Sequence, residues 1–403
     1  DQPRSRGLGD VYKRQVNLFR AVRMVIPPAW QNAQILDPDI RSFHEYNSMH
    51  MEPWDGPAGI VMSDGKWAVC LLDRNGLRPA RFQIDSDDNI TIASETGVNP
   101  VDNDKIISKG RIGPGGIIAV NTFTGEILNQ TEIDNDLKTK FPYREWLKKN
   151  TEYIESTLDT FEGPGLKKMD AEEFAISSKQ FLLFKEERTS VIKPLAVDSQ
   201  EGTGSMGDDT ALAVMSKIHR QIYDYFRQQF AQVTNPPIDS LRENKVMSLK
   251  TRFGNLGNIL DFDNLTEENI YVLDSPVLSN SQFDKFIDFF GKNQRILDCL
   301  FNKNSDLESA LENLKNQAEQ AAREGITQLI LTDKNISSEK LPMPMLLCIG
   351  AVNTHLIKLG LRGYVSINVQ TGDALDTHSF ATLIGVGATT VNPYLAFDSL
   401  FER

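Results

Sequence analysis

The chain has 403 residues, of which 40% are hydrophobic and 24% are charged, and its formal net charge is -12. This length predicts two or three domains with more than one hydrophobic core. The acidic balance argues against binding a nucleic-acid backbone, which needs a basic surface. No run approaches the roughly 18 apolar residues that mark a membrane span, so we expect binding neither to nucleic acid nor to a membrane.

The cysteines and histidines predict no metal site. Cys70, Cys299 and Cys348 are far apart and form no C-x-x-C pattern. We expect three buried, unpaired thiols in a reducing cytoplasm. The histidines form no H-x-x-x-H pair, so each is expected to be hydrogen-bonded or exposed. They are His44, His50, His219, His355 and His378.

The chain begins with a segment that does not look native. Residues 1–15 are charged and contain glycine, and they show neither the helical nor the strand period. We interpret them as a junction foreign to the native protein and exclude them from the fold. Residues 16–26 then carry apolar side chains at helical or buried spacing and stop at two prolines. Asp37-Pro38 is a signal for the start of a second helix.

A β-rich region follows, with apolar runs separated by turn residues. We expect antiparallel hairpins in a row, because no helix long enough for a parallel crossover lies between the runs. The expected hairpins pair residues 59–62 with 67–71, 81–84 with 90–93, and 117–120 with 126–128.

Two motifs in this region allow a functional interpretation. Residues 73–81, DRNGLRPAR, predict a turn at Asn75-Gly76, either with solvated arginines or with arginines placed near an anionic ligand. Residues 109–116, KGRIGPGG, suggest a phosphate loop, but they fail the G-x-x-x-x-G-K-[ST] pattern. The proline in that run favours a connecting turn.

The pattern of polar and apolar residues changes in the second half of the chain. Residues 131–174 are polar and predict a helical linker at a domain boundary. Helices are then predicted over 211–230 and 307–323. After them strands and helices alternate, which favours parallel βαβ units. The alternating segments are 326–331 (strand), 345–359 (helix), 364–369 (strand), 377–385 (helix) and 388–391 (strand).

Other polar motifs leave their role open. Residues 202–210, GTGSMGDDT, could cap a helix or bind an anion. Residues 230–243 contain Pro236-Pro237, which predicts only a helix stop. Glu126 with Asp134, or Asp208 with Asp209, could act as carboxylate pairs, but acidic residues are common in this chain and nothing singles these out.

Taken together, several strings resemble one family in one order. The chain is similar to the large subunits of glutamate synthases from Val16 to Arg403. The matching strings are MVIPPAWQN, EYNSMHMEPWDGPAGI, DRNGLRPAR, ASETGV, PYREWL, GSMGDDTALAV, FAQVTNPPIDSLRE and VNPYLAF. DRNGLRP followed by ASE is also similar to glutamine phosphoribosylpyrophosphate amidotransferase, which fits a shared class II amidotransferase domain.

The resemblance implies the fold class and the domains. It implies an α+β amidotransferase portion of the N-terminal-nucleophile type, with antiparallel sheets, followed by an α/β central domain with parallel βαβ units. We expect the second half of the amidotransferase domain over residues 16–150, a helical linker over 151–175, and the central domain over 176–403.

The resemblance also implies an activity for the parent enzyme. An N-terminal cysteine hydrolyses glutamine, and its own α-amino group can act as the base because its pKa is about 7.7–8.0. Ammonia then crosses an internal channel and meets 2-oxoglutarate at an FMN site. The imine is reduced to glutamate with electrons delivered through an iron–sulfur cluster. The donor is NADPH, NADH or ferredoxin, through a small electron-transfer subunit or ferredoxin as partner.

This chain departs from the family pattern at both ends. Its first residue is Asp1, and the segments for the oxyanion hole, the FMN barrel and the cysteine cluster belong outside it. We therefore expect an internal piece with no catalytic residue of its own, no bound FMN or iron–sulfur cluster, and the missing domains of the same chain as partners.

Three residues remain as candidates by the resemblance. Thr234 and Asn235 are expected near the entrance of the ammonia channel, where short neutral side chains would pass ammonia without trapping it. Arg78 is expected to support the glutamine pocket, although a structural role fits equally well. The other interpretations are a non-catalytic scaffold that retains the fold, and a phosphoribosylpyrophosphate amidotransferase, which GSMGDDTALAV disfavours.

Overall fold

The computed structural model describes most of the chain in two compact units. The first unit contains the described residues up to Glu152 and a few later ones, and the second contains most of the chain from Tyr153 onward. The described residues are 16–154, 169–202, 211–227, 248–254 and 270–401, except 34, 52, 55, 212 and 218. Each unit is considered by itself.

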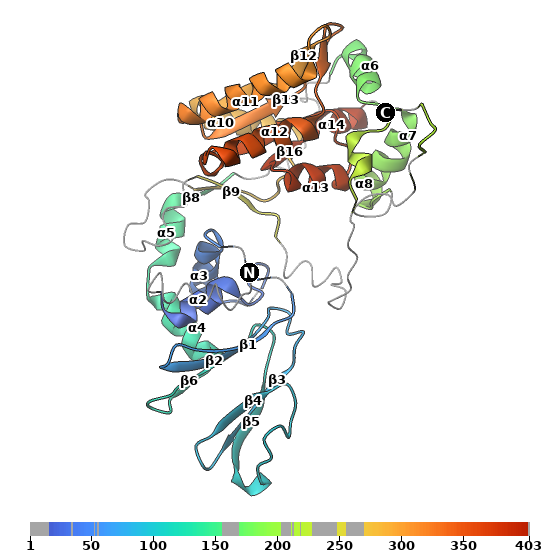
Figure 1. The fold of residues 1–403 in the computed structure, drawn as a ribbon. Helices are drawn as coiled ribbons and strands as arrows, with labels where there is room; N and C mark the ends of the chain where they lie inside the picture. Colours follow the sequence, from blue (N-terminus) through green and yellow to red (C-terminus); the bar gives the residue numbers. More distant parts are fainter. Residues whose placement is uncertain are drawn as a thin grey trace. The chain divides into compact units, whose positions relative to one another are not determined.

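The described part of the first unit combines four α-helices with two antiparallel sheets (Figure 1). The strand orders are β1-β2-β6-β7 and β4-β3-β5. The elements are α2 (Leu18–Val25), α3 (Pro38–Ser48), β1 (Gly59–Ser63), β2 (Trp67–Leu72), β3 (Ala80–Asp85), β4 (Ile90–Ala93), η1 (Asn103–Lys105), β5 (Ile106–Ile112), β6 (Ile117–Asn121), β7 (Ile127–Leu128), α4 (Gln130–Thr139) and α5 (Tyr143–Asn150).

Both predicted helices near the start of the unit are confirmed, and local capping explains where they begin. The Asn17 side chain accepts hydrogen bonds from two backbone N–H groups of α2, and α2 ends just before Pro27. Asp37 caps α3 in the same way, with Pro38 in the first turn. All eight residues of α2 are buried, so this helix forms the centre of the unit.

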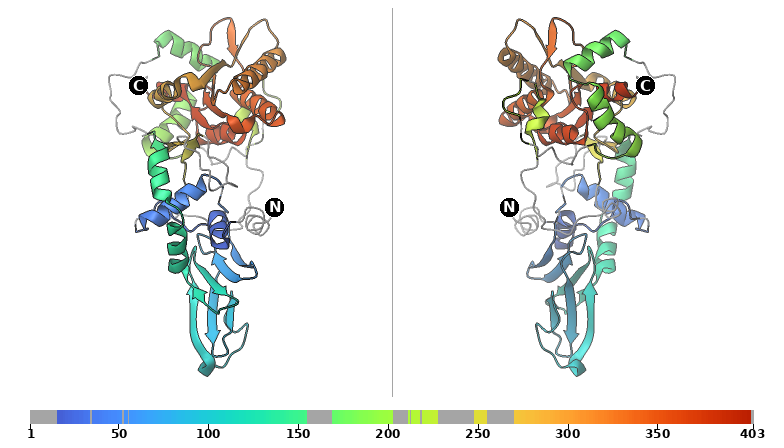
Figure 2. Two further views of the ribbon diagram at one scale, coloured as in Figure 1. Left: turned by 90° about the vertical axis from the view of Figure 1, so that its left-hand side faces the viewer. Right: turned by 90° about the vertical axis from the view of Figure 1, so that its right-hand side faces the viewer.

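The hydrophobic core of the first unit lies between its helices and the β1-β2-β6-β7 sheet. Apolar side chains of α2 and α3 pack there with Leu71 of β2 and Ala119 of β6. Ile133 and Leu137 of α4 are also part of this core. Hence α4 and α5 are not a polar helical linker as the sequence suggested, because their apolar faces complete the first unit. Figure 2 shows from two sides that the β3-β4-β5 sheet lies apart from these helices.

The three predicted hairpins are confirmed as antiparallel pairs, but they do not form one row. The chain changes sheets between β2 and β3 and again between β5 and β6. Pro114 of the glycine-rich run lies in the turn between β5 and β6, as predicted, while residues 109–112 of the same run belong to β5. A strand tolerates Gly110 because the Phe82 ring fills its side-chain space, 2.6 Å from where a Cβ would lie.

The second unit is built on a parallel sheet in the order β11-β13-β15-β16. Its elements are α6 (Ala171–Gln180), α7 (Lys185–Glu187), η3 (Arg188–Ile192), α8 (Lys193–Asp198), η4 (Ile222–Tyr225), α10 (Asn280–Phe290), η5 (Gly291–Asn293), β11 (Gln294–Asp298), β12 (Leu300–Asn302), α11 (Leu307–Arg323), β13 (Gln328–Thr332), β14 (Lys340–Pro342), α12 (Met345–Lys358), η6 (Arg362–Tyr364), β15 (Ser366–Gln370), α13 (Thr377–Gly385), β16 (Thr390–Asn392) and α14 (Tyr394–Phe401).

Two small sheets complete the description of the strands. β12 pairs with β14 in an antiparallel ribbon. Three short strands form a sheet in the order β8-β10-β9. They are β8 (Thr151–Tyr153), β9 (Thr251–Phe253) and β10 (Ile270–Leu273).

The predicted alternation of strands and helices after residue 307 is confirmed. Helices α11, α12 and α13 connect successive neighbours in the sheet, so their crossovers run in one direction and share one face. Their buried residues form one core with Leu329, Leu331, Ile367, Val369 and Val391 of the strands. The antiparallel sheets followed by a parallel sheet agree with the predicted fold class.

One predicted helix is wrong in its described part. Residues 211–227, apart from 212 and 218, form turns and the short η4, with no α-helix. The reason is tertiary: the Tyr223 hydroxyl donates to Asp373 at 2.7 Å, and the Gln221 amide donates to the carbonyl of Phe181 at 2.8 Å. These bonds hold the segment against the parallel sheet's loops and override its helical spacing.

The second face of the parallel sheet carries buried polar residues joined in two rows. In the first, Thr390 Oγ1 donates to Asn368 Oδ1 (2.8 Å), and Asn368 Nδ2 donates to Gln328 Oε1 (3.0 Å). In the second, Gln370 accepts from Thr332 Oγ1 at 3.0 Å and donates to Asn392 Oδ1 at 3.2 Å. The period-two alternation of strands places these side chains opposite the apolar set.

Replacing Asn368 tests the first row. We expect Asn368→Ala to reduce the free energy of unfolding by about 2–4 kcal/mol, because it leaves the amide oxygen of Gln328 and the hydroxyl of Thr390 buried without their partner. The measurement is urea unfolding followed by circular dichroism. Asn316→Ala on the exposed face of α11 is the control and should change stability by less than about 0.5 kcal/mol. Equal effects of the two variants would contradict a structural role for the row.

Candidate functional site

Of the three candidate residues predicted from the sequence, one lies within the described part of the chain. Thr234 and Asn235 lie outside the described residues, as do residues 203–210 of the glycine-rich motif. Arg78 is described and exposed, on the loop between β2 and β3. The structure therefore places one of the three.

The Arg78 loop is organised by the buried carboxylate of Asp73. This carboxylate accepts hydrogen bonds from the backbone N–H groups of Ala58 (3.1 Å), Asn75 (3.0 Å) and Leu77 (3.4 Å). The Asp73 carbonyl accepts from Gly76 at 3.0 Å and from Gly115 at 2.8 Å. Thus the loop is held by its own backbone and by the turn after β5, and Arg78 projects from a rigid base.

The turn differs from the one that the sequence predicted. Gly76 has φ of +61°, whereas Asn75 does not adopt positive φ. The segment links two sheets and is not the tip of a hairpin. The Asp73 carboxylate satisfies the turn's N–H groups, so the turn does not depend on cross-strand pairing.

A buried arginine binds the turn after β5, which contacts the Asp73 loop. Arg23 of α2 donates from Nη1 to the carbonyl of Gly115 at 2.7 Å and from Nε to Asp134 at 3.2 Å. Its side chain is fully buried, so it must be paired. Asp134, weighed from the sequence as half of a carboxylate pair with Glu126, is instead the counter-ion of Arg23.

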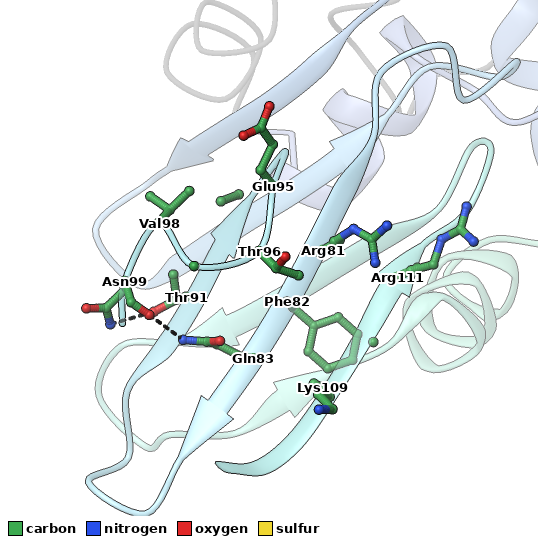
Figure 3. Close-up of a pocket in the computed structure, with 13 residues that line it drawn as sticks. Arg81, Phe82, Gln83, Thr91, Glu95, Thr96, Val98, Asn99, Lys109 and Arg111 are labelled. Carbon is green, nitrogen blue, oxygen red and sulfur yellow. Dashed lines mark hydrogen bonds between the residues drawn. The ribbon is translucent and has the colours of Figure 1, made fainter. Parts of the chain in front are cut away.

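A cavity of about 240 Å³ lies on the β3-β4-β5 sheet under the 94–99 loop (Figure 3). Arg81 and Arg111 face each other in register across β3 and β5, and Lys109 shares their cavity. Asn99 holds the loop down, accepting from Gln83 at 3.0 Å and donating to Thr91 at 3.1 Å. The three cations are exposed, which fits a solvated face that can attract carboxylates. Arg78 does not line it.

A second polar cluster lies at the carboxyl end of the parallel sheet, where α/β proteins commonly place their sites. Asp333 directly follows β13, and Thr371, Gly372 and Asp373 follow β15. Thr371 Oγ1 lies 2.5 Å from Asp333 Oδ2 and 2.8 Å from Asp373 Oδ1. Asp333 and Thr371 are fully buried, and Asp373 retains some exposure.

The cluster ties four elements together. Asp333 Oδ1 accepts from the N–H of Gly372 at 3.0 Å. Asp373 accepts from the hydroxyl of Tyr223 on η4 at 2.7 Å and from the N–H of Met345 at the start of α12 at 3.3 Å. Burial, and then the charge of Asp373, raise the pKa of Asp333 well above its usual value. Burial likewise raises the pKa of Asp373.

Sequence reasoning did not find this cluster. A signal was present: one acidic residue follows the predicted strand 326–331, and another follows the strand predicted at 364–369. Because neighbouring parallel strands end at one edge of a sheet, the two carboxyls can meet although 40 residues of chain separate them.

The cysteines agree with the prediction and one histidine does not. All three cysteines are buried and unpaired. Burial raises the pKa of Cys70 to about 11. His355 pairs with Glu319 at 2.9 Å, as expected of a satisfied histidine. His44, however, is buried with no hydrogen-bond partner for Nε2 in the described structure, and burial beside Arg23 lowers its pKa to about 3.

The described residues contain neither a metal-binding cluster nor a membrane-spanning helix. Within them, no group of three or more histidine, cysteine, aspartate or glutamate side chains is arranged to hold a metal ion. Also within them, no helix combines the length and the apolar character needed to cross a membrane.

Comparison with known families divides the chain in two. Residues 9–146 match the class-II glutamine amidotransferases, and residues 177–403 match the glutamate synthase central domain.

Individual relatives support the same assignment. The glutamate synthase [NADPH] large chain of Azospirillum brasilense is 42% identical over 407 residues, which cover 99% of this chain and 27% of that protein. The corresponding large chain of Bacillus subtilis is 38% identical over 93% of this chain and 24% of its own length. The ferredoxin-dependent glutamate synthase of Oryza sativa is 38% identical over 94% and 24%. The chain thus spans about a quarter of the length of these relatives, and the resemblance seen in its motifs is confirmed.

Gly76 provides a test of the Asp73 loop. A Cβ at Gly76 would lie 2.9 Å from the Pro114 Cα, in addition to the strain of positive φ. We expect Gly76→Ala to cost about 3 kcal/mol or more in the free energy of unfolding. Gly125→Ala, also at positive φ but with nothing within 4 Å, should cost only about 1–2 kcal/mol. Chemical denaturation of both variants measures the two losses in the free energy of unfolding. Equal losses would show that the contact with Pro114 is unimportant.

His44 predicts a pH dependence of stability. Its folded pKa of about 3 lies below the ordinary value of 6.5, so its contribution is complete above pH 6.5 and is lost as the pH falls towards 3. We expect His44→Phe to reduce the stability lost between pH 6.5 and pH 5 by about 2 kcal/mol. His219→Phe, at an exposed position, should leave the loss unchanged. The prediction fails if the two variants have the same pH profile of unfolding.

Proposed function

Because the chain belongs to the glutamate synthase central-domain family, we propose that it is part of a glutamate synthase large chain. The proposed reaction of the whole protein makes two glutamates from glutamine and 2-oxoglutarate. The observation that carries this proposal is the order of the two family matches, an amidotransferase portion followed by the central domain, within relatives that are 38–42% identical over nearly the whole chain.

We assign the two units different parts of this reaction. The first unit is the second half of an amidotransferase domain of the N-terminal-nucleophile type, which supports a glutamine pocket. The second unit is the central domain, which ammonia passes on its way to the synthase site. The stable hydrogen-bonded frame of both units supports positioning roles, and we place the nucleophilic cysteine in another part of the whole protein.

The described residues do not fit the iron–sulfur cluster of the parent reaction. An iron–sulfur cluster needs several cysteine thiolates, but the described part of the chain gathers no such group. Burial raises the pKa of the Cys299 thiol well above its usual value, which opposes a thiolate there. We therefore assign the cluster to another part of the whole protein, and the resemblance to the family implies the same for FMN.

The proposal gives Arg78 a role as support for the glutamine pocket. Its loop is fixed by the Asp73 carboxylate, and its exposed guanidinium can hold a carboxylate through two parallel hydrogen bonds. Arg78→Ala should then raise KM for glutamine with little change in kcat. An unchanged KM would assign Arg78 a purely structural role.

Thr234 and Asn235 are proposed as residues of the ammonia route. Support comes from the resemblance of the TNPPID string and from the chemistry of short, neutral, polar side chains. Such groups can pass ammonia without the charge that would protonate or retain it.

The proposal allows three electron donors and two kinds of partner protein. The relatives are named as NADPH-dependent, NADH-dependent and ferredoxin-dependent. The partner is accordingly a small electron-transfer subunit or a ferredoxin. The three unpaired, buried cysteines support a reducing compartment, for which we propose the cytoplasm.

The experiment uses the complete protein encoded by the gene, supplied with glutamine and 2-oxoglutarate and with each electron donor in turn. We expect two glutamates for every two electrons taken from one of the donors. Thr234→Val should leave glutamine hydrolysis largely intact but release several-fold more free ammonia per glutamate formed.

The control is Thr189→Val, an exposed hydroxyl in the second unit, which should keep the coupled stoichiometry. A complete protein that hydrolyses glutamine without reducing 2-oxoglutarate would contradict the synthase, and one with neither activity would favour a scaffold. Coupled turnover that is unaffected by Thr234→Val would reject only the channel assignment.

A further inference from the structure

The cluster around Thr371 contains fewer hydrogens than its contacts require. The Thr371 hydroxyl has one hydrogen, yet its oxygen lies within hydrogen-bond distance of two carboxyl oxygens, at 2.5 Å and 2.8 Å. The N–H of Asp373 also approaches this oxygen, at 3.3 Å, and uses one of its lone pairs. If both carboxyls were ionised, one contact would set two oxygens with lone pairs against each other.

We propose that this cluster is a proton-binding site in which Asp333 holds a proton and donates it in a hydrogen bond to Thr371 Oγ1. Thr371 in turn donates its own hydrogen to Asp373. Each O–H then has one acceptor, and both contacts become attractive. The short 2.5 Å distance suits the hydrogen bond from the acid.

The surroundings of the two carboxyls decide which one is ionised. Asp373 receives three donors in this arrangement: Thr371, the Tyr223 hydroxyl and the N–H of Met345. It also retains some exposure to water. Asp333 is completely buried, and its Oδ1 receives the N–H of Gly372. The negative charge is therefore better supported on Asp373.

The other ionisable groups nearby do not offer a compensating charge for a second anion. The Tyr394 hydroxyl on α14 lies close to Asp333 but makes no well-aligned hydrogen bond in the described structure, and as a neutral group it supplies no compensating charge. The Lys334 ammonium lies 5.9 Å from the centre of the Tyr394 ring and faces Asp398. The groups that face the cluster are Tyr223 on η4, Tyr394 and Asp398 on α14, Cys299 after β11, Asp376 before α13, His378 on α13, and Lys334.

The bound proton stabilises the contacts that hold η4 against the cluster. With the proton in place, Asp373 can hold the hydroxyl of Tyr223. The backbone carbonyl of Tyr223 also accepts a hydrogen bond from His378 Nε2 at 3.1 Å. Loss of the proton would place two carboxylates on one hydroxyl and favour opening of these contacts. This property concerns the second unit alone and does not depend on the proposed enzyme reaction.

The sign of the pH effect follows from the opened state. Asp333 in water has an ordinary pKa of about 3.9, and in the closed cluster it stays protonated to a higher pH. Opening therefore releases a proton at intermediate pH, and the equilibrium constant for opening should rise about tenfold per pH unit until the closed site itself deprotonates.

Hydrogen exchange with mass spectrometry on the complete protein tests the site. Peptides that cover 221–226 should lose protection by up to about tenfold per pH unit above about pH 5, after correction for intrinsic exchange. Asp333→Asn carries no titrating proton and should remove this pH dependence. Asp373→Asn removes the second carboxylate and should also flatten it, which covers the case that the first variant does not fold.

Asp306→Asn is the matched control, because Asp306 is an exposed helix cap and asparagine caps equally well. It should keep the wild-type pH profile at 221–226. The proposal is overturned if wild-type protection is independent of pH, or if Asp333→Asn and Asp373→Asn both keep the wild-type slope.

Discussion

The register of the four parallel strands is the constraint on which most of the second unit depends. In that register Leu329, Ile367 and Val391 face the helices together, while Gln328, Asn368 and Thr390 meet on the opposite face. A shift of one residue would exchange the two sets and bury unpaired amides against apolar helices. The hydrogen bonds within the polar rows are therefore possible in this register and would be lost in a shifted one.

The same register brings the strand ends together. Asp333 and the Thr371–Asp373 segment meet because β13 and β15 end side by side. From there the hydrogen bonds extend to α12 and η4, so one buried cluster connects the sheet edge to elements far away in the sequence.

The first unit uses buried charge in a comparable way. Asp73 and Arg23 are both buried; backbone N–H groups satisfy Asp73, and the Gly115 carbonyl and the Asp134 carboxylate pair with Arg23. Each therefore stabilises a loop conformation that the loop's own residues would not select. This explains why Arg78 can project from an ordered base although its side chain is exposed.

The sequence by itself determined the elements with strong periodicity or clear caps, such as the helices over Leu307–Arg323 and Thr377–Gly385 and the hairpins of the first unit. Their local patterns and their tertiary roles agree. Only the tertiary structure decided that Gly110 lies in a strand, under the Phe82 ring, and that Tyr223 lies in a short turn bound to Asp373. It also decided that Asp333 and Asp373 share one hydroxyl. These outcomes rest on contacts between residues distant in the chain, which no local pattern encodes.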